Sequence, residues 1–280
     1  MTILKTMVWM SPFVRSLRKL LFRLLAPPVR LPTDPIPASW NDFVCRQVRL
    51  AAHLSPADRE RLFRIMQLFL REVPIEGCLG LEVTEEIRVT IAAQASLLLL
   101  KMPYPRYARV RRVLVYPSAF VPTTVALHPT GQVVRPDVPL RGQASLSGVV
   151  VLGWDEVRRD TLITTDGENV VLHEFAHMLD AEDGSMDGVP VLDSGTAYRA
   201  WAALLSEEFA EHVQRTARGE PTALSPYGAT NRAEFFAVAT EAFFERPLQL
   251  RAEEPRLYAM LVDFFKLDPV LAPPPGGTTS

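Results

Sequence analysis

The sequence predicts an α+β domain in which helices pack around a small, mostly antiparallel sheet. Apolar residues recur at helical spacing in several long segments, whereas two short apolar runs, 112–116 and 148–153, are typical of strands. The stretch between these runs is rich in proline, glycine and valine, and we expect further short strands or a hairpin there. The chain has 280 residues and no visible internal repeat, so we expect one main domain with extensions at its ends.

The expected helices follow in chain order. The first covers 40–54, and Ser55 with Pro56 then forms the N-cap and first turn of a second helix. Leu62, Ile65 and Phe69 give that helix an apolar face directed at the core. A third helix begins at Thr84, with acidic residues in its first turn, and runs to about residue 100. Three more are expected at 197–218, 231–244 and 255–266.

Composition and charge exclude some classes of partner. The net charge is −2 and the isoelectric point is near 6.2, so the chain lacks the basic surface of a nucleic-acid binder, and we expect no direct contact with nucleic acid. Its two cysteines, Cys45 and Cys78, form no CxxC pair. We therefore expect reduced, buried thiols and a cytoplasmic protein.

The ends differ in character from the middle of the chain. We expect residues 1–37 to form a basic arm and a proline-rich linker, 38–270 the main domain, and 271–280 a flexible tail. The arm has neither the unbroken apolar core of a secretory signal nor the length of a membrane span. Residues 13–25 could form a short basic amphipathic helix that touches a membrane surface. A disordered arm, or a start codon upstream of the natural one, explains the segment more simply than membrane contact does.

The motif HEFAH at 173–177 is the strongest chemical signal in the chain. Residues four apart share a helix face, so His173 and His177 can direct their imidazoles at one metal ion, with Glu174 placed to take a proton from a water molecule. Asp166 is the expected N-cap of this helix, and Gly184 its expected stop. The competing interpretation is that both histidines only pack or cap, but paired histidines beside a carboxylate have few structural uses.

A catalytic zinc needs a third protein ligand, and the residues alone leave it open. The metzincin pattern would use Asp183, but that pattern needs glycine where Asp180 stands. The alternative is a glutamate on a later helix, either Glu234 or Glu241, which lie seven residues apart and share one face. Glu234 also has capping-box spacing from Asn231, so it could instead serve the start of its helix.

Several blocks of sequence, in the same order, resemble the Mlc titration factor A family of zinc peptidases. They are VLVYPSAFV at 113–121, VVVLGW at 149–154, HEFAHMLD at 173–180, GVP at 188–190, PYGATNRAEFFAV at 226–238 and EAFFERP at 241–247. The similarity runs from about Trp40 to the DP at 268–269.

The resemblance implies a gluzincin-like metallopeptidase domain with one Zn²⁺ per chain. Its ligands would be His173, His177 and Glu234, with Glu174 as general base and Tyr227 facing the metal. It also implies a cytosolic, aminopeptidase-like hydrolase acting on peptides or proteins. One member of the family binds the transcriptional repressor Mlc, so an alternative function is a regulatory protein that sequesters a repressor of that type.

For several other polar residues the sequence allows more than one role. Asp180 and Glu241 could each orient an imidazole from behind or could simply face solvent. His128 and His212 belong to no motif and are expected at the surface. The strand 149–152 could present an edge to an extended peptide, although its unbroken apolar run fits a buried core strand better.

Overall fold

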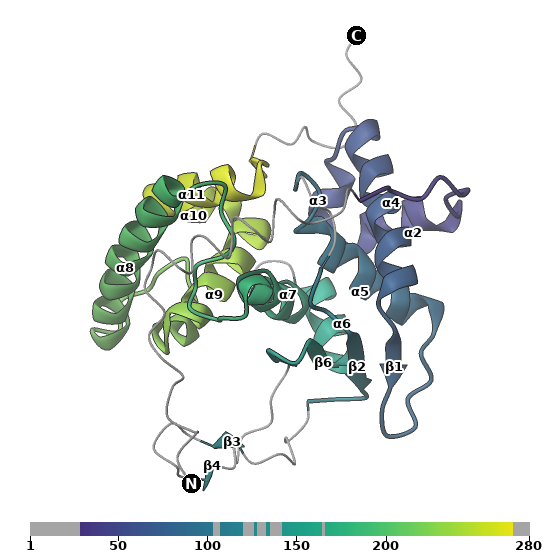
Figure 1. Ribbon diagram of the computed structural model, residues 1–280, viewed down its shortest axis with the longest axis horizontal. Helices are drawn as coiled ribbons and strands as arrows, with labels where there is room; N and C mark the ends of the chain where they lie inside the picture. Colours follow the sequence, from purple (N-terminus) through teal and green to yellow (C-terminus); the bar gives the residue numbers. More distant parts are fainter. Residues whose placement is uncertain are drawn as a thin grey trace, which may run out of the picture.

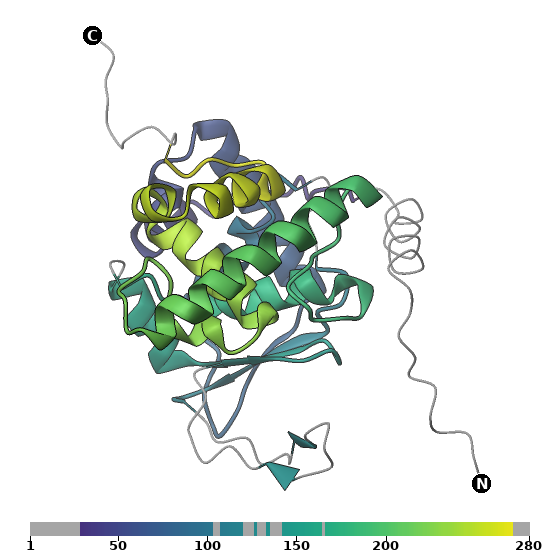
Figure 2. The same cartoon turned by 90° about the vertical axis from the view of Figure 1, so that its left-hand side faces the viewer.

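The computed structural model describes residues 29–102, 107–119, 126–127, 133–134, 142–163 and 166–270, and the structural statements that follow concern these residues. They form a four-stranded sheet beside a larger body of helices (Figures 1 and 2). The strand order is β1 (Ile75–Gly77), β2 (Arg112–Tyr116), β6 (Val149–Gly153) and β5 (Gly142–Ala144). A separate antiparallel ladder joins β3 (Ala126–Leu127) to β4 (Val133–Val134), in line with the short strands expected there.

The α+β class is confirmed, but the expected strand directions are wrong. β2 runs parallel to both β1 and β6, and the pairing of β5 with β6 is the antiparallel one in this sheet. Parallel neighbours require a long crossover, and helix α5 (Glu85–Leu97) lies in the connection between β1 and β2. The apolar runs that identify strands contain no information about direction, which depends on how the intervening segments pack.

The helix that contains HEFAH, α7 (Val170–Asp180), is central to the helical body. It lies between α9 (Arg232–Glu245) and α5 in Figure 1 and contacts both of them. Phe175 of α7 packs against Phe69 and Tyr107, with ring centroids 5.5 and 4.8 Å apart. Burial on several sides therefore fixes the orientation of α7. The remaining helices are α2 (Ser39–Gln47), α3 (Arg49–Ala52), α4 (Pro56–Glu72), α6 (Trp154–Leu162), α8 (Gly195–Ala217), α10 (Pro247–Glu253) and α11 (Pro255–Phe265).

Several element boundaries follow the predicted caps and some do not. The hydroxyls of Ser55 and Thr84 accept hydrogen bonds from backbone N–H groups of α4 and α5, as their positions predict. The helix expected over 40–54 is broken at Val48, whose backbone is extended at φ −124° and ψ 100°. Helices α6 and α10 and strand β1 were not predicted. α6 is charged along most of its length and buries only Val157 and Asp160, so its apolar periodicity is weak.

The ends of the chain lie outside the described residues. The basic arm up to residue 28 and the tail 271–280 are among them, so the domain boundaries and the membrane contact of the arm stay predictions. Among the helices that the structure does describe, none is both long and apolar enough to cross a membrane. Cys45 and Cys78 are free thiols, and both are only partly buried rather than fully buried as expected.

Candidate metal and catalytic site

Helix α7 begins with a different cap from the one expected. The side-chain oxygen of Asn169 accepts a hydrogen bond from the backbone N–H of Leu172 at 3.0 Å, which makes Asn169 the N-cap. Asp166 instead accepts from the backbone N–H of Glu168 within the preceding loop. At the other end, one turn of 3₁₀ helix, η1 (Ala181–Asp183), leads to Gly184 at φ +93°, so the expected stop is confirmed.

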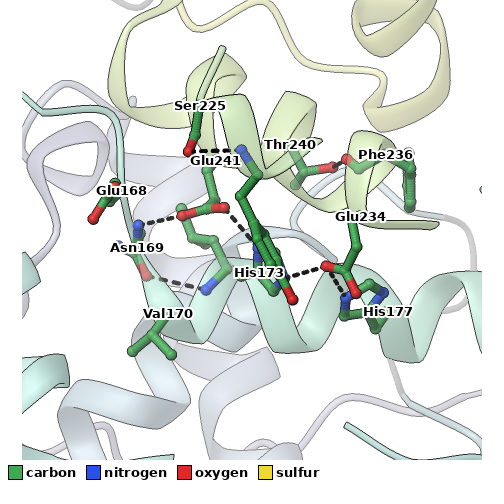
Figure 3. Close-up of polar contacts among 12 residues, drawn as sticks. Glu168, Asn169, Val170, His173, His177, Ser225, Glu234, Phe236, Thr240 and Glu241 are labelled. Carbon is green, nitrogen blue, oxygen red and sulfur yellow. Dashed lines mark hydrogen bonds and ion pairs between the residues drawn. The ribbon is translucent and has the colours of Figure 1, made fainter. Parts of the chain in front are cut away.

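Three side chains from two helices converge above α7 (Figure 3). The Nε2 atoms of His173 and His177 lie 3.0 and 3.2 Å from Oε2 of Glu234, which is on α9. The N-terminus of α9 is capped by Asn231, whose Oδ1 accepts from the backbone N–H of Glu234 at 3.0 Å. The Asn231 side chain thus serves the start of α9, while the Glu234 carboxylate contacts the two imidazoles.

The donor set suits a catalytic zinc ion. The ligand atoms of His173, His177 and Glu234 all lie within 4.8 Å of one another. Donors held at about 2.0–2.1 Å from a tetrahedral zinc stand roughly 3.3 Å apart, close to the separations of 3.0 and 3.2 Å seen here. Two imidazoles and one carboxylate are also a typical ligand set for a catalytic zinc that keeps one position open.

The three groups strongly shift one another's protonation. Burial opposes ionisation of Glu234, but hydrogen bonds from both imidazoles outweigh it and lower the pKa of Glu234 to about 2. Burial lowers the pKa of His173, yet the charge of Glu241 and the hydrogen bonds to Glu234 and Glu241 outweigh burial and raise that pKa well above its ordinary value. The cluster thus holds an ionised carboxylate between two imidazole nitrogens. A metal cation bound there would replace the protons that these groups share.

Glu241 lies behind His173, on the side away from the cluster (Figure 3). Its Oε1 is 2.7 Å from Nδ1 of His173, and its Oε2 accepts from the backbone N–H of Asn169 at 2.6 Å. The side-chain amide of Asn169 donates in turn to Glu245 at 2.9 Å. An imidazole whose Nδ1–H is held by a carboxylate presents Nε2 as the free metal donor. The solvent-facing alternative for Glu241 is wrong, because this residue is buried.

Glu174 points into the protein beside the two histidines and is only 5% exposed. Burial raises the pKa of Glu174 to about 7, although both neighbouring imidazoles lower it. Strand β5 passes directly over this side chain: a Cβ atom added to Gly142 would lie 2.6 Å from Oε1 of Glu174. Only glycine allows the strand to approach the carboxyl group so closely.

Tyr227 lies in a short 3₁₀ turn, η2 (Pro226–Ala229), just before α9. Its ring centroid is 5.9 Å from that of His173, and the residue is 53% exposed. Desolvation, together with the charge of Glu234, raises the pKa of Tyr227 to about 12. The phenol is therefore a hydrogen-bond donor at any physiological pH.

The other sequence candidates are not among the three residues that converge in this cluster. Asp183 accepts hydrogen bonds from the backbone N–H and hydroxyl of Ser185, within its own turn. Asp180 is fully buried, and its Oδ2 accepts from the backbone N–H of Gly188 at 2.8 Å, so it does not face solvent. His212 is also buried, contrary to expectation, and His128 lies outside the described residues. Sequence reasoning missed Asn169 and Gly142. Asn169 could have been found, because asparagine is a preferred N-cap and stands directly before the apolar run that begins α7.

Comparison with known proteins identifies the family of this chain. A family model described as glucose-regulated metallo-peptidase M90 matches residues 26–266. An uncharacterized protein of Synechocystis sp. is 37% identical over 239 residues, covering 85% of this chain and 86% of that protein. Mlc titration factor A of Klebsiella pneumoniae is 30% identical over 229 residues (80% and 84%), and that of Serratia proteamaculans 29% over 237 residues (83% and 88%). The chain therefore belongs to the M90 family of glucose-regulated metallo-peptidases, the family of Mlc titration factor A.

Proposed function

We propose that this protein is a zinc-dependent peptidase with an aminopeptidase-like substrate range. The observation that supports this most is the convergence of His173, His177 and Glu234 on one point, with Glu174 on the same helix as the two histidines. Hydrolysis needs a nucleophile, a base and a group that stabilises the oxyanion, and the described residues offer a candidate for each.

The roles follow from the chemistry of each group. Zinc held by the two histidines and Glu234 would lower the pKa of a water molecule to about 7 and polarise the substrate carbonyl. Glu174 would take the proton from the attacking water and pass it to the departing amine. The protonated phenol of Tyr227 would donate a hydrogen bond to the oxyanion that develops on the substrate, and Tyr227→Phe is expected to lower kcat about 10²- to 10³-fold.

The substrate would bind along β5. The strand 149–152 cannot serve as the edge, because β6 lies between β2 and β5. The backbone N–H of Ser145 donates to Val149 of β6, so the alternate residues Gly142 and Ala144 direct their backbone groups away from β6. An extended peptide could pair with these groups next to Glu174. A peptide-bound structure without backbone pairing to β5 would contradict this role.

Metal content and hydrolysis, measured on the same samples, test the proposal. Zinc per chain is determined by elemental analysis, and turnover with a panel of amino-acid and short-peptide reporters, for wild type, Glu174→Gln and Glu234→Ala. We expect one zinc per chain in wild type and in Glu174→Gln, little zinc in Glu234→Ala, and activity in wild type alone. Wild-type activity that survives complete removal of zinc would refute the proposal.

A second function is favoured by the names of the relatives. Several are called Mlc titration factor A, so this chain could likewise bind and sequester a transcriptional repressor of the Mlc type. Glu174→Gln separates the two functions, because it should abolish hydrolysis and leave binding to a purified repressor unchanged. If a purified repressor binds neither wild type nor Glu174→Gln, this protein does not sequester that repressor. The cytoplasmic location that both functions assume stays a prediction.

A further inference from the structure

His212 is a buried residue of α8 that the proposed chemistry does not use. Its Nε2 lies 3.1 Å from the carbonyl oxygen of Ser225, and its ring packs on Phe235 at a centroid distance of 5.6 Å. A carbonyl can only accept, so Nε2 must carry the proton and donate. Burial lowers the pKa of His212, which favours this neutral form of the ring.

The Ser225 carbonyl connects the turn that contains Tyr227 to helix α8. It accepts two hydrogen bonds, one from His212 and one from the backbone N–H of Gly228 at 3.0 Å. Thr230 closes the other end, because its backbone N–H and hydroxyl donate to the Tyr227 carbonyl at 3.1 and 2.7 Å. A Cβ atom on Gly228 would lie 3.3 Å from Nε2 of His212, so the turn and the imidazole are in close contact.

The side chain of Tyr227 has little packing of its own. More than half of the surface of the residue is exposed, and its ring contact is with His173. Among the described residues its hydroxyl has no hydrogen-bond partner. The orientation of the phenol therefore depends on the backbone of the turn, and His212 of α8 binds that backbone at Ser225.

We propose that His212 is a positioning residue for Tyr227: its hydrogen bond to Ser225 fixes the turn 225–230 so that the phenol stays over the metal cluster. This inference rests on the proposed function, in which Tyr227 donates to the oxyanion. A displacement of about 1 Å at a reacting group can lower the rate up to about 100-fold. We expect a loss of about 10- to 100-fold in kcat when the His212 hydrogen bond is removed.

Three variants test the hydrogen bond itself by hydrogen–deuterium exchange of the backbone amides in 225–230. His212→Phe keeps an aromatic ring beside Phe235 but cannot donate, whereas His212→Gln keeps an N–H donor. Phe209→Leu is the control, because Phe209 also lies on α8 and packs on Phe235, at 5.8 Å. We expect faster exchange in His212→Phe, and near wild-type exchange in the other two. Unchanged exchange in His212→Phe, or equal acceleration in Phe209→Leu, would overturn the inference.

A double-mutant cycle with Tyr227→Phe tests the link to catalysis. If His212 acts through Tyr227, His212→Phe lowers kcat in wild type with little change in KM, but has little further effect in Tyr227→Phe. Losses that multiply in the double variant would refute the positioning role. Absence of turnover in wild type would count against the proposed function alone, and the exchange experiment would still decide whether His212 holds the turn.

Discussion

Glu241→Gln replaces one carboxylate oxygen with an amide group, so two hydrogen bonds that Glu241 accepts can no longer form together. With metal on Nε2 of His173, the Nδ1–H donates to one oxygen of Glu241, and the backbone N–H of Asn169 donates to the other, at 2.7 and 2.6 Å. Glutamine offers only one acceptor. If its oxygen faces Asn169, its amide donates to Nδ1 and moves the ring proton to Nε2, which blocks metal binding. If its oxygen faces His173, its amide group opposes the Asn169 N–H.

The magnitude follows from these two orientations. Loss of the outer partner of a ligating histidine commonly weakens metal affinity 10- to 100-fold, which corresponds to about 1.4–2.7 kcal/mol. Opposed buried donors cost about 1–3 kcal/mol in folding free energy. The orientation that leaves Nε2 free for metal is the one with opposed donors, so we expect Glu241→Gln to raise the Kd for zinc about 10- to 100-fold. The metal-free protein can adopt the other orientation and should avoid that cost in stability.

Competition with a chromogenic chelator measures the zinc Kd, and thermal unfolding of metal-free samples measures stability. Glu245→Gln is the matched control: it lies one turn further along α9 and accepts from the Asn169 side chain rather than from an imidazole. Glutamine at 245 can keep that contact, and no metal ligand loses its hydrogen-bond partner. The zinc Kd of Glu245→Gln should therefore stay within about threefold of wild type. A zinc Kd for Glu241→Gln equal to that of the control would refute the reasoning.

Three further outcomes are expected. Gly142→Ala places a Cβ atom 2.6 Å from Glu174, so its free energy of unfolding in urea should fall by about 1–3 kcal/mol. Gly195→Ala is the control, because its Cβ would have its nearest contact at 3.8 Å, and its stability should be near that of wild type. Equal stability of the two variants would contradict the argument. Burial raises the pKa of Glu245 to about 7 from 4.5, so the folded chain keeps a proton that the unfolded chain releases, and stability falls as pH rises from about 5 to 8. In metal-free protein this fall in the free energy of unfolding is on the order of 2–3 kcal/mol, and Glu245→Gln should abolish it. If Glu245→Gln leaves the pH dependence of stability unchanged, the Glu245 carboxyl is not its cause. Glu234→Asp shortens the ligand, so zinc content should fall after dialysis while the fold, checked by circular dichroism, persists.

Local signals predicted the parts of this protein that depend on neighbours in sequence. Ser55 and Thr84 cap their helices where the pattern places them, because capping involves residues only three positions apart. The strand at 112–116 was found with its observed limits, since it is short, apolar and followed by proline. The two histidines of HEFAH share a face for the same local reason.

Features that depend on distant segments could not be predicted in this way. The direction of β6 relative to β2 depends on the path of the chain between them. His212 had no motif, and its burial arises from the turn at 225–230 packing on α8. Asp166 and Asn169 are both good capping residues, and the choice between them follows partly from Glu241, which holds the backbone N–H of Asn169 from another helix.

The two glutamates that helical periodicity could not separate both contact one imidazole. Glu234 meets Nε2 of His173 and Glu241 meets Nδ1, so a single face of α9 contacts the ring from both sides. Seven residues span two turns, which brings both carboxylates onto the face of α9 that crosses α7. Because Glu241 also binds the backbone at the start of α7, the crossing of the two helices is fixed by groups outside the ligand set. A metal would then bind to imidazoles that are already oriented, and the two glutamates would influence its affinity through different atoms of the same ring.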